Sequence, residues 1–582
     1  MNQPSHKKQP ARKKKVPATL EKRPIPVSND DFKNIIEGNY AYVDKTLFIQ
    51  ELWENGADVS IIPRPRRFGK TINMSTLRYF FEKSDTSNSH LFKNLKIWKE
   101  PKYRALQGTF PVIFITLKEA KDDTSWEATF STIKNIIAKE YSRHDYLLRS
   151  KTLKQIDKKI FKDIVNGTAS DTVYSFSLKY LSEFLSNFYK RKVIVLIDEY
   201  DSPIINAYLR DFYDPMLSFM RKWLGAGLKG NSYLERGVIT GILRVTKEDL
   251  FSSLNNPMTF TLLNATFADK FGFLEEEVYA LLKEYGLTSK LEGMRKWYNG
   301  YRIGTTTVYN PWSVNNCLHQ GGELDPYWTN TGGTELLERF ILQGNARVKS
   351  ELEAILEGHE SVQPITEGTP LSVLDKDGAS VWNMLLFSGY LTLAAPPVKK
   401  EGVANCSLRI PNYEVYCVYN NIIKNWFENT ITDANMLLNS LVKGDINTFS
   451  TMFNHFIIET LSYYDLAKDD PEKVYHALVL GMLAFLRETH EIKSNRESGY
   501  GRYDVMVIPK NRSELGIVIE FKIFDPKQNK DLAAAARSGL KQIEEKQYAQ
   551  ELYQRGINRV QAICMAFHKK KVVIKDTLYT KK

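Results

Sequence analysis

The sequence is poor in cysteine and lacks a long apolar run. Four cysteines occur in 582 residues, Cys317, Cys406, Cys417 and Cys564. They show neither the paired spacing of a zinc site nor the density of a disulfide scaffold, which fits a reducing cytoplasm and argues against a catalytic cysteine. The longest apolar stretch, residues 476–486, is well short of the roughly 18 residues that a membrane-spanning helix requires. No apolar segment of a signal peptide follows the polar N-terminus. We therefore expect a cytoplasmic protein with no membrane segment.

Positive charge is in excess but unevenly placed. The net charge is +12, and residues 1–23 hold eight Lys or Arg against the single Glu21, so this segment carries +7 and the rest of the chain +5. The segment is polar and contains three prolines, which predicts a disordered tail. A nucleic-acid-binding arm, a localisation signal and a solvated terminus all remain open for it. The charge of the folded body says little about DNA.

The length exceeds what one hydrophobic core usually supports, so we expect several domains. Short β-rich apolar runs at residues 59–62, 111–117, 193–197 and 237–241 are separated by segments long enough for helices. This order is typical of a parallel α/β sheet, and we assign residues 24–289 to it. Residues 290–470 mix aromatic-rich turns with helical stretches and predict a mostly helical middle region.

A second α/β domain is expected over residues 471–582. The pattern there predicts a helix at 472–487, strands at 490–494, 503–509 and 516–524, a helix at 532–553, and strands at 560–566 and 571–574. A short turn near residues 511–514 should make the second and third of these strands an antiparallel pair.

A phosphate-binding loop is predicted where the first strand ends. Such a loop needs backbone N–H groups around the phosphates, a Lys for the terminal phosphates and a hydroxyl for magnesium, all at a helix N-terminus. The sequence of residues 64–71, RPRRFGKT, is followed by a helix at 72–81. The expected nucleotide contacts are Arg67, Phe68, Gly69, Lys70 and Thr71, with Thr71 also on the magnesium ion. Arg64 stands where the usual pattern begins with Gly.

A second part of the same site follows a buried strand. The apolar run 193–197 ends in Asp198 and Glu199, where a phosphate-loop NTPase holds magnesium and orients the attacking water. One further apolar strand lies between the two motifs in sequence, which favours the ATPase branch that includes AAA+ proteins. The next strand ends at Thr240, with Arg244 nearby, where such enzymes place a γ-phosphate sensor. We therefore expect ATP and Mg²⁺ as cofactors.

The C-terminal domain carries a charged pair in an apolar strand. Glu520 and Lys522 are two residues apart, so both project from one face of the strand, and Asp504 begins the preceding strand. Asp504 and Glu520 can bind one divalent ion while Lys522 positions or deprotonates a water, which is the chemistry of metal-assisted phosphodiester hydrolysis. Gln542 could orient the site from the next helix. Glu472 and His476 remain open as further contributions from the preceding helix.

These motifs resemble AAA-ATPase-like proteins that carry a C-terminal PD-(D/E)XK nuclease domain, found mainly in bacteria. The resemblance extends over nearly all of the chain after residue 24 and rests on residues 42–46, 64–71, 198–201, 297–301, 309–312, 389–391, 499–504 and 520–522. The family's loop also begins with Arg, so Arg64 is the family's form. The resemblance implies an ATP site and a nuclease-like site. It leaves a homo-oligomer through the NTPase domain open.

Two hypotheses follow for function. In the first, nucleotide binding or hydrolysis controls a metal-dependent nuclease, a hydrolase acting on nucleic acid, with DNA as the expected substrate. In the second, the protein is a nucleotide-controlled switch whose nuclease-like domain binds nucleic acid or a partner without cutting. Asp504, Glu520 and Lys522 favour the first, because a pure binding fold does not need all three. A secreted effector directed by the basic tail is a third possibility.

Overall fold

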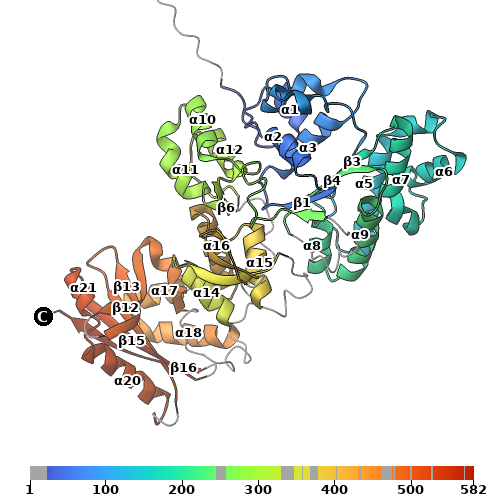
Figure 1. Cartoon of the computed structure of the whole chain (residues 1–582). Coiled ribbons are helices and arrows are strands. Elements are labelled where there is room, and N and C mark those ends of the chain that lie inside the picture. Colours follow the sequence, from blue (N-terminus) through green and yellow to red (C-terminus); the bar gives the residue numbers. More distant parts are fainter. Residues whose placement is uncertain are drawn as a thin grey trace, which may run out of the picture.

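The structure is a computed structural model. It describes residues 22–243, 257–328, 346–356, 358–367, 378–400, 403–430, 434–460, 475, 479–480, 482–498, 501–525, 529–568 and 571–581. Figure 1 shows an α/β region at the N-terminal end, a mostly helical middle and a second sheet with its helices at the C-terminal end. The mixed α/β fold class predicted from the sequence is confirmed.

The N-terminal region is built around a five-stranded parallel sheet. Its strands are β1 Val59–Pro63, β2 Val112–Thr116, β3 Val193–Asp198, β4 Leu234–Gly241 and β5 Pro257–Thr259. Its α-helices are α1 Phe32–Glu37, α2 Leu47–Glu54, α3 Lys70–Phe81, α4 Pro101–Arg104, α5 Trp126–Ser142, α6 Gln155–Val165, α7 Asp171–Tyr189, α8 Ser202–Leu209 and α9 Tyr213–Leu228, with 3-10 helices η1 Asn88–Leu91, η2 Lys96–Lys99 and η3 Asp145–Arg149. Four of the strands lie where the sequence predicts them, whereas the three-residue β5 was not predicted.

The strand order is β2-β3-β4-β1-β5, and every neighbouring pair is parallel. β4 therefore separates β1, which leads into the predicted phosphate loop at residues 64–71, from β3, which ends in Asp198. Because all strands run the same way, their carboxyl ends lie at one edge, which is where ligands bind in open α/β sheets. The side chains that follow β1, β3 and β4 meet at that edge.

Helices cover both faces of this sheet, and the side chains of β3 pack alternately against the two layers. Val193, Val195 and Ile197 belong to a core formed with α5, α7 and α9, whereas Ile194 and Leu196 belong to a core formed with α1 and α3. Successive side chains of a strand point to opposite faces, so a strand buried on both sides must be apolar throughout. This explains the continuous apolar run that predicted the strand.

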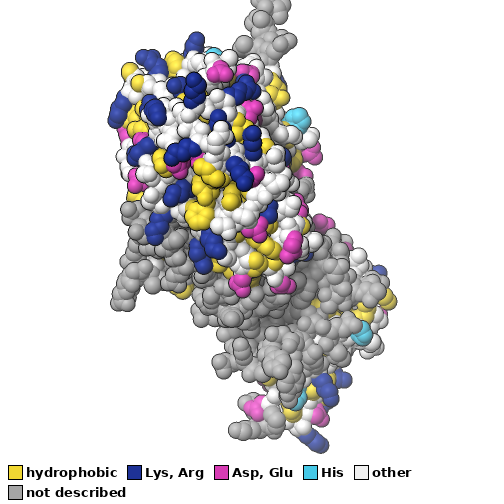
Figure 2. Space-filling model, turned by 90° about the vertical axis from the view of Figure 1, so that its right-hand side faces the viewer, with side chains coloured by type: hydrophobic (Ala, Val, Ile, Leu, Met, Phe, Trp, Pro, Cys, Tyr) yellow, Lys and Arg dark blue, Asp and Glu magenta, His cyan; other side chains and the backbone are white. Residues whose placement is uncertain are grey.

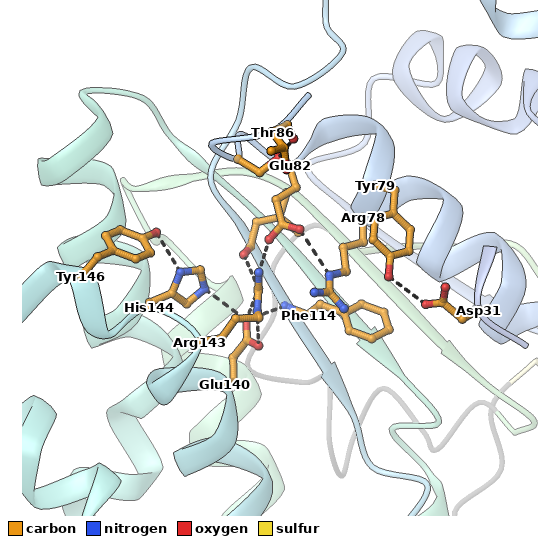
Figure 3. A network of polar contacts seen from close by, with 12 residues as sticks. Asp31, Arg78, Tyr79, Glu82, Thr86, Phe114, Glu140, Arg143, His144 and Tyr146 are labelled. Carbon is orange, nitrogen blue, oxygen red and sulfur yellow. Dashed lines mark hydrogen bonds and ion pairs between the residues drawn. The ribbon is translucent and has the colours of Figure 1, made fainter. Parts of the chain in front are cut away.

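The edge strand β2 is closed by side chains (Figure 3). The backbone N–H of Phe114 donates to the Glu140 carboxylate at 2.9 Å, and Arg143 donates to the carbonyl of Val112 at 2.8 Å. Arg143 also pairs with Glu82 at the end of α3, and His144 lies 3.4 Å from Glu140. An edge strand with satisfied hydrogen-bonding groups cannot recruit another strand.

The middle region is mostly helical, as predicted, and also contains short strands. Its helices are α10 Glu275–Tyr285, α11 Leu291–Tyr298, α12 Pro311–His319, α14 Ala346–Leu356, α15 Gly378–Ser388 and α16 Tyr413–Thr430, with the 3-10 helix η4 Thr288–Lys290. The strands are β6 Tyr301–Ile303, β7 Thr306–Val308, β8 Ser361–Ile365, β9 Thr392–Leu393, β10 Val398–Lys400 and β11 Val403–Arg409. Buried residues of β6, β7, α15 and α16 share one core with the N-terminal sheet. The middle region therefore packs directly on the N-terminal region.

The C-terminal region contains a mixed sheet of order β12-β13-β14-β15-β16. Its strands are β12 His490–Ser498, β13 Gly501–Pro509, β14 Gly516–Ile523, β15 Arg559–His568 and β16 Lys571–Thr580. Its helices are α17 Ala434–Lys443, α18 Ile446–Thr460, α20 Leu532–Glu545 and α21 Gln550–Gln554, with the 3-10 helix η7 Ala484–Glu488. β13 and β14 are antiparallel, as predicted, and β14 and β15 are parallel.

Two features of this region differ from the sequence-based picture. The continuous helix predicted at 532–553 is wrong, because the chain leaves the helical conformation at Gln547, whose φ of 54° is left-handed, between α20 and α21. Helices α17 and α18 fall within the residues assigned to the middle, yet they share a core with the C-terminal sheet. Of the helix predicted at 472–487, residues 475, 479–480 and 482–483 are helical and residues 484–488 form the 3-10 helix η7, while the others lie outside the described residues.

The surface carries charges of both signs. Figure 2 views the α/β region from the side of α6 and α7, where Lys and Arg side chains surround a group of hydrophobic side chains. Exposed residues on these two helices include Ile156, Lys159, Lys162, Phe176 and Lys179. Among the described residues, no helix is both long enough and apolar enough to cross a membrane.

Candidate functional site

Asp198 is the point where three elements of the N-terminal sheet meet. Its carboxylate lies at the end of β3 and is fully buried. The hydroxyl of Thr71, from the first turn of α3, donates to Oδ2 at 2.8 Å, and the hydroxyl of Thr240, from β4, donates to Oδ1 at 2.5 Å. Burial and the neighbouring Glu199 charge raise the pKa of Asp198. The structure thus brings together three residues that the sequence predicts for one site.

The phosphate loop ends in an uncapped helix N-terminus. Gly69 precedes α3 with a left-handed φ of 79°, and no side chain caps the first turn. Uncapped N–H groups at a helix start, together with the helix dipole, favour an anion there. Phe68 is buried, whereas Arg67 is exposed and has a left-handed φ of 67°. The start of α3 is therefore open to an anion.

Lys70 is folded back onto its own loop. Its Nζ donates to the carbonyl oxygens of Arg64 at 3.1 Å and Pro65 at 2.9 Å, and the side chain is only 5% exposed. Burial lowers the pKa of Lys70, although the Glu199 and Asp198 carboxylates oppose this effect. An ammonium held by two carbonyls at the carboxyl edge of the sheet can exchange these partners for phosphate oxygens.

The Arg64 side chain has a structural role in holding the start of the loop. Its side chain is completely buried, and Nη1 donates to the carbonyl oxygens of Pro63 at 2.9 Å and Phe260 at 2.6 Å. It also lies 5.1 Å from the ring centroid of Phe271. Burial lowers the pKa of Arg64 to about 9. The side chain therefore ties the start of the loop to the segment that follows β5.

Glu199 and Asp201 differ in their surroundings. Glu199 is partly exposed, has a left-handed φ of 52° and accepts a hydrogen bond from the Ser202 hydroxyl at 3.1 Å. Asp201 is buried and accepts from the backbone N–H groups of Ile242 at 2.8 Å and Leu243 at 2.7 Å. Burial raises the pKa of Asp201 to about 6, against the effect of these two hydrogen bonds. Asp201 thus fixes the segment after β4, and sequence reasoning assigned it no role.

The middle region touches the loop, which sequence reasoning also missed. The ring of Phe68 meets Tyr301 of β6 edge-on, with centroids 4.8 Å apart. A Cβ on Gly389, whose φ is 90°, would lie 2.9 Å from Cβ of Pro65. Both contacts involve stretches that carry the family resemblance, which was the only available signal. Arg244, the second predicted sensor residue, lies outside the described residues.

The C-terminal site contains a closed triangle of hydrogen bonds. Lys522 Nζ donates to Glu520 Oε1 at 2.9 Å and to Gln542 Oε1 at 2.8 Å, while Gln542 Nε2 donates to Glu520 Oε1 at 2.5 Å. Glu520 is only 3% exposed. Burial alone would lower the pKa of Lys522, but the charge and hydrogen bond of Glu520 raise it above the ordinary value. The same-face geometry predicted for Glu520 and Lys522 is present.

Asp504 joins this site from β13. Its Oδ2 accepts the backbone N–H of Phe521 at 2.7 Å. The β13–β14 ladder pairs residues 505–507 with residues 517–519, so the Asp504 side chain takes a backbone donor just beyond the paired part. The structure therefore places this carboxylate at the backbone between Glu520 and Lys522, as expected for one site.

The two carboxylates fit a magnesium ion in their chemistry. Carboxylate oxygens are the hard donors that Mg²⁺ prefers, and Mg²⁺ often takes only one or two of them and keeps several waters. The described residues contain no group of three or more His, Cys, Asp or Glu suited to a metal. Glu472 and His476, the possible further contributors, lie outside the described part of the chain.

Comparison with known proteins identifies a domain family at each end of the chain. Residues 26–251 match the family model described as a predicted AAA-ATPase, and residues 470–577 match that of the PD-(D/E)XK nuclease superfamily. A relative named "Uncharacterized protein in vnfD 5'region", from Azotobacter chroococcum mcd 1, is 23% identical over 552 residues, which cover 92% of this chain and 95% of the relative. The chain therefore combines an AAA-ATPase-like domain with a PD-(D/E)XK nuclease superfamily domain.

Proposed function

We propose that the N-terminal site binds and hydrolyses ATP with Mg²⁺. The observation that carries this proposal is the Asp198 carboxylate, which receives the hydroxyls of Thr71 and Thr240 beside an uncapped helix N-terminus. A hydroxyl and a carboxylate in this relation are the magnesium ligands of phosphate-loop NTPases.

The residues of this site have distinct proposed roles. Backbone N–H groups of residues 67–71 surround the phosphates, and Lys70 exchanges the carbonyls of its loop for phosphate oxygens. Thr71 and Asp198 hold the magnesium ion, which neutralises charge on the terminal phosphates. Glu199 orients the attacking water, and Thr240 reports the presence of the terminal phosphate through Asp198.

We propose further that the C-terminal site cleaves phosphodiester bonds of nucleic acid, with DNA as the expected substrate. Asp504 and Glu520 bind Mg²⁺ there, Lys522 positions or deprotonates the attacking water, and Gln542 orients Glu520 and Lys522. The supporting observation is the triangle of hydrogen bonds around Glu520, because a buried carboxylate is costly unless charged or polar partners satisfy it. Bound metal supplies Lewis-acid chemistry.

The two activities are proposed to be coupled, with nucleotide state controlling cleavage. ATP and nucleic acid are both abundant inside cells, which favours the cytoplasm as the site of action. A homo-oligomer formed through the NTPase domain is compatible with this proposal. The second candidate is a switch that binds nucleic acid without cutting it. It is favoured by the small metal-ligand set among the described residues.

Measurement of ATP affinity and turnover tests the nucleotide proposal. Lys70→Ala should abolish tight ATP binding, because the loop loses the charge that reaches the terminal phosphates. Glu199→Gln should retain ATP affinity and lose hydrolysis. Glu119→Gln, at an exposed ion pair with Lys139, is the control for both. Unchanged ATP affinity in Lys70→Ala by calorimetry would exclude this site.

A further inference from the structure

Arg67 of the phosphate loop stacks on a tryptophan of the middle region. The guanidinium carbon lies 3.9 Å from the ring centroid of Trp312 in α12. A guanidinium over an indole face is an attractive cation–π contact, and its planar N–H groups remain available around the edge. Within the described residues, no hydrogen bond or ion pair occupies the Arg67 side chain. A stacked arginine with unused donors is suited to bind an anion.

The surroundings of Arg67 indicate which anion it would meet. Arg67 is two residues before Gly69 in the loop, and its side chain interacts electrostatically with Glu199, the proposed water-orienting residue. Partial desolvation lowers the pKa of Arg67, and the carboxylates of Glu199 and Asp30 oppose that effect. The guanidinium is therefore close enough to feel the Glu199 charge.

Trp312 is itself held in place. Asn310 caps α12 by accepting the backbone N–H groups of Trp312 at 2.9 Å and Ser313 at 3.4 Å, and Pro311 occupies the first helical position. The indole Nε1 donates to the carbonyl of Tyr327 at 3.3 Å. A capped helix start and an anchored ring give Arg67 a fixed surface to lie on.

We propose that Trp312 is a positioning residue that holds the Arg67 guanidinium for contact with the terminal phosphate of a nucleoside triphosphate, so that the middle region helps select triphosphate over diphosphate. This inference rests on the proposed function of the nucleotide site. An arginine fixed by stacking loses less side-chain freedom when it binds phosphate, and its paired N–H groups match phosphate oxygens. The middle region then senses the nucleotide through a direct contact with the loop.

Affinities for ATP and ADP, both with Mg²⁺, test the proposal by calorimetry on the full chain. Arg67→Ala should weaken ATP binding by about tenfold, the order expected for one charge-assisted contact, and ADP binding by less than threefold. Trp312→Ala should reproduce most of this loss, and Trp312→Phe should restore it, because Phe retains an aromatic face. The double variant Arg67→Ala/Trp312→Ala should be no weaker than Arg67→Ala alone.

The control is Trp297→Ala. Trp297 meets Tyr413 edge-on with centroids 4.7 Å apart inside the middle region, so its loss should leave the ratio of ATP to ADP affinity unchanged. Equal weakening of ATP and ADP in Arg67→Ala, or additive losses in the double variant, would overturn the proposal. If Trp312→Ala does not fold, Trp312→Leu, which keeps a large apolar side chain without an aromatic face, takes its place and should show the same loss. Failure of the nucleotide site itself would appear differently, as ATP affinity that Lys70→Ala does not change.

Discussion

Gly539 of α20 lies directly against Cys564 of β15, so that a Cβ at residue 539 would be 2.2 Å from the cysteine Sγ. The same Cβ would be 3.3 Å from Cγ of Lys522. Glycine therefore lets α20 approach the sheet closely. Gln542 follows almost one helical turn later and reaches Glu520 and Lys522 from this close position.

Gly539→Ala should consequently weaken the C-terminal site. The added methyl group forces α20 away from β15 and takes Gln542 out of hydrogen-bond range of Glu520, so we expect nuclease activity to fall by at least tenfold while ATP hydrolysis is unchanged. Overpacking of this kind costs about 1–3 kcal/mol. Cys564→Ala should restore activity to Gly539→Ala, because it vacates the space that the methyl group needs. If nuclease activity stayed low in the double variant, the effect of Gly539→Ala would not come from displacement of Gln542.

The closure of β2 predicts acid sensitivity near the edge of the N-terminal sheet. Burial alone would raise the pKa of Glu140, but the charge and hydrogen bonds of Arg143 and the neighbouring His144 lower it to about 2. A carboxyl whose pKa is lower in the folded state stabilises the fold above its unfolded pKa, and this stabilisation is lost as pH falls from about 4.5 toward 2. Burial lowers the pKa of His144, so the folded state also loses stability on this account as pH falls below the ordinary histidine pKa of about 6.5. The Glu140 contribution is on the order of 3 kcal/mol.

Hydrogen exchange followed by mass spectrometry can measure this loss locally. Protection of peptides covering β2 should fall between pH 6 and pH 3 after correction for intrinsic exchange. Glu140→Gln should show lower protection at pH 7 and a weaker dependence on pH. Glu119→Gln serves as the exposed control. An unchanged pH dependence in Glu140→Gln would show that this carboxylate does not stabilise the edge.

The basic tail predicts a salt-sensitive contribution to nucleic-acid affinity. Six of its eight Lys or Arg residues, those before residue 22, should bind phosphates without sequence preference, whereas Lys22 donates to the Tyr285 carbonyl and Arg23 pairs with Glu284. Deletion of residues 2–21 should weaken DNA binding at low salt and reduce the slope of affinity against salt concentration. ATP hydrolysis should be unaffected. Equal DNA affinity of the truncated and full-length chains in a filter-binding assay would leave the tail as a localisation signal or a spacer.

Much of the geometry of the candidate nucleotide site could be predicted because its signals are local. An apolar strand places Asp198 at a sheet edge, and the sequence of residues 64–71 places Thr71 at a helix start, so general rules of strands and helices bring them together. Glu520 and Lys522 were likewise predicted from the period of two along a strand. Their proposed catalytic roles stay predictions until activity is measured.

Other features depend on contacts that local patterns do not contain. The stacking of Arg67 on Trp312 joins residues far apart in the sequence, and nothing in their neighbourhoods indicates the contact. In the sequence, Asp201 is simply another acidic residue after a strand. Its role becomes evident only from its hydrogen bonds to the backbone N–H groups of the two described residues after β4. The break at Gln547 was missed because the helical pattern continues through it, whereas the backbone there turns left-handed.

The most direct test of the central claim is cleavage of nucleic acid by the full chain with Mg²⁺, with and without ATP, using single- and double-stranded DNA and RNA. The wild type should cut at least one substrate in a nucleotide-dependent manner. Asp504→Ala, Glu520→Ala and Lys522→Ala should each lose cleavage by orders of magnitude while retaining substrate binding, because members of one catalytic unit do not act additively. Glu545→Gln, at an exposed pair with Lys541 on α20, should cut normally. Absence of cleavage by the wild type with ATP and Mg²⁺, or undiminished cleavage by Asp504→Ala, would contradict the account and favour a nucleotide-controlled binding protein.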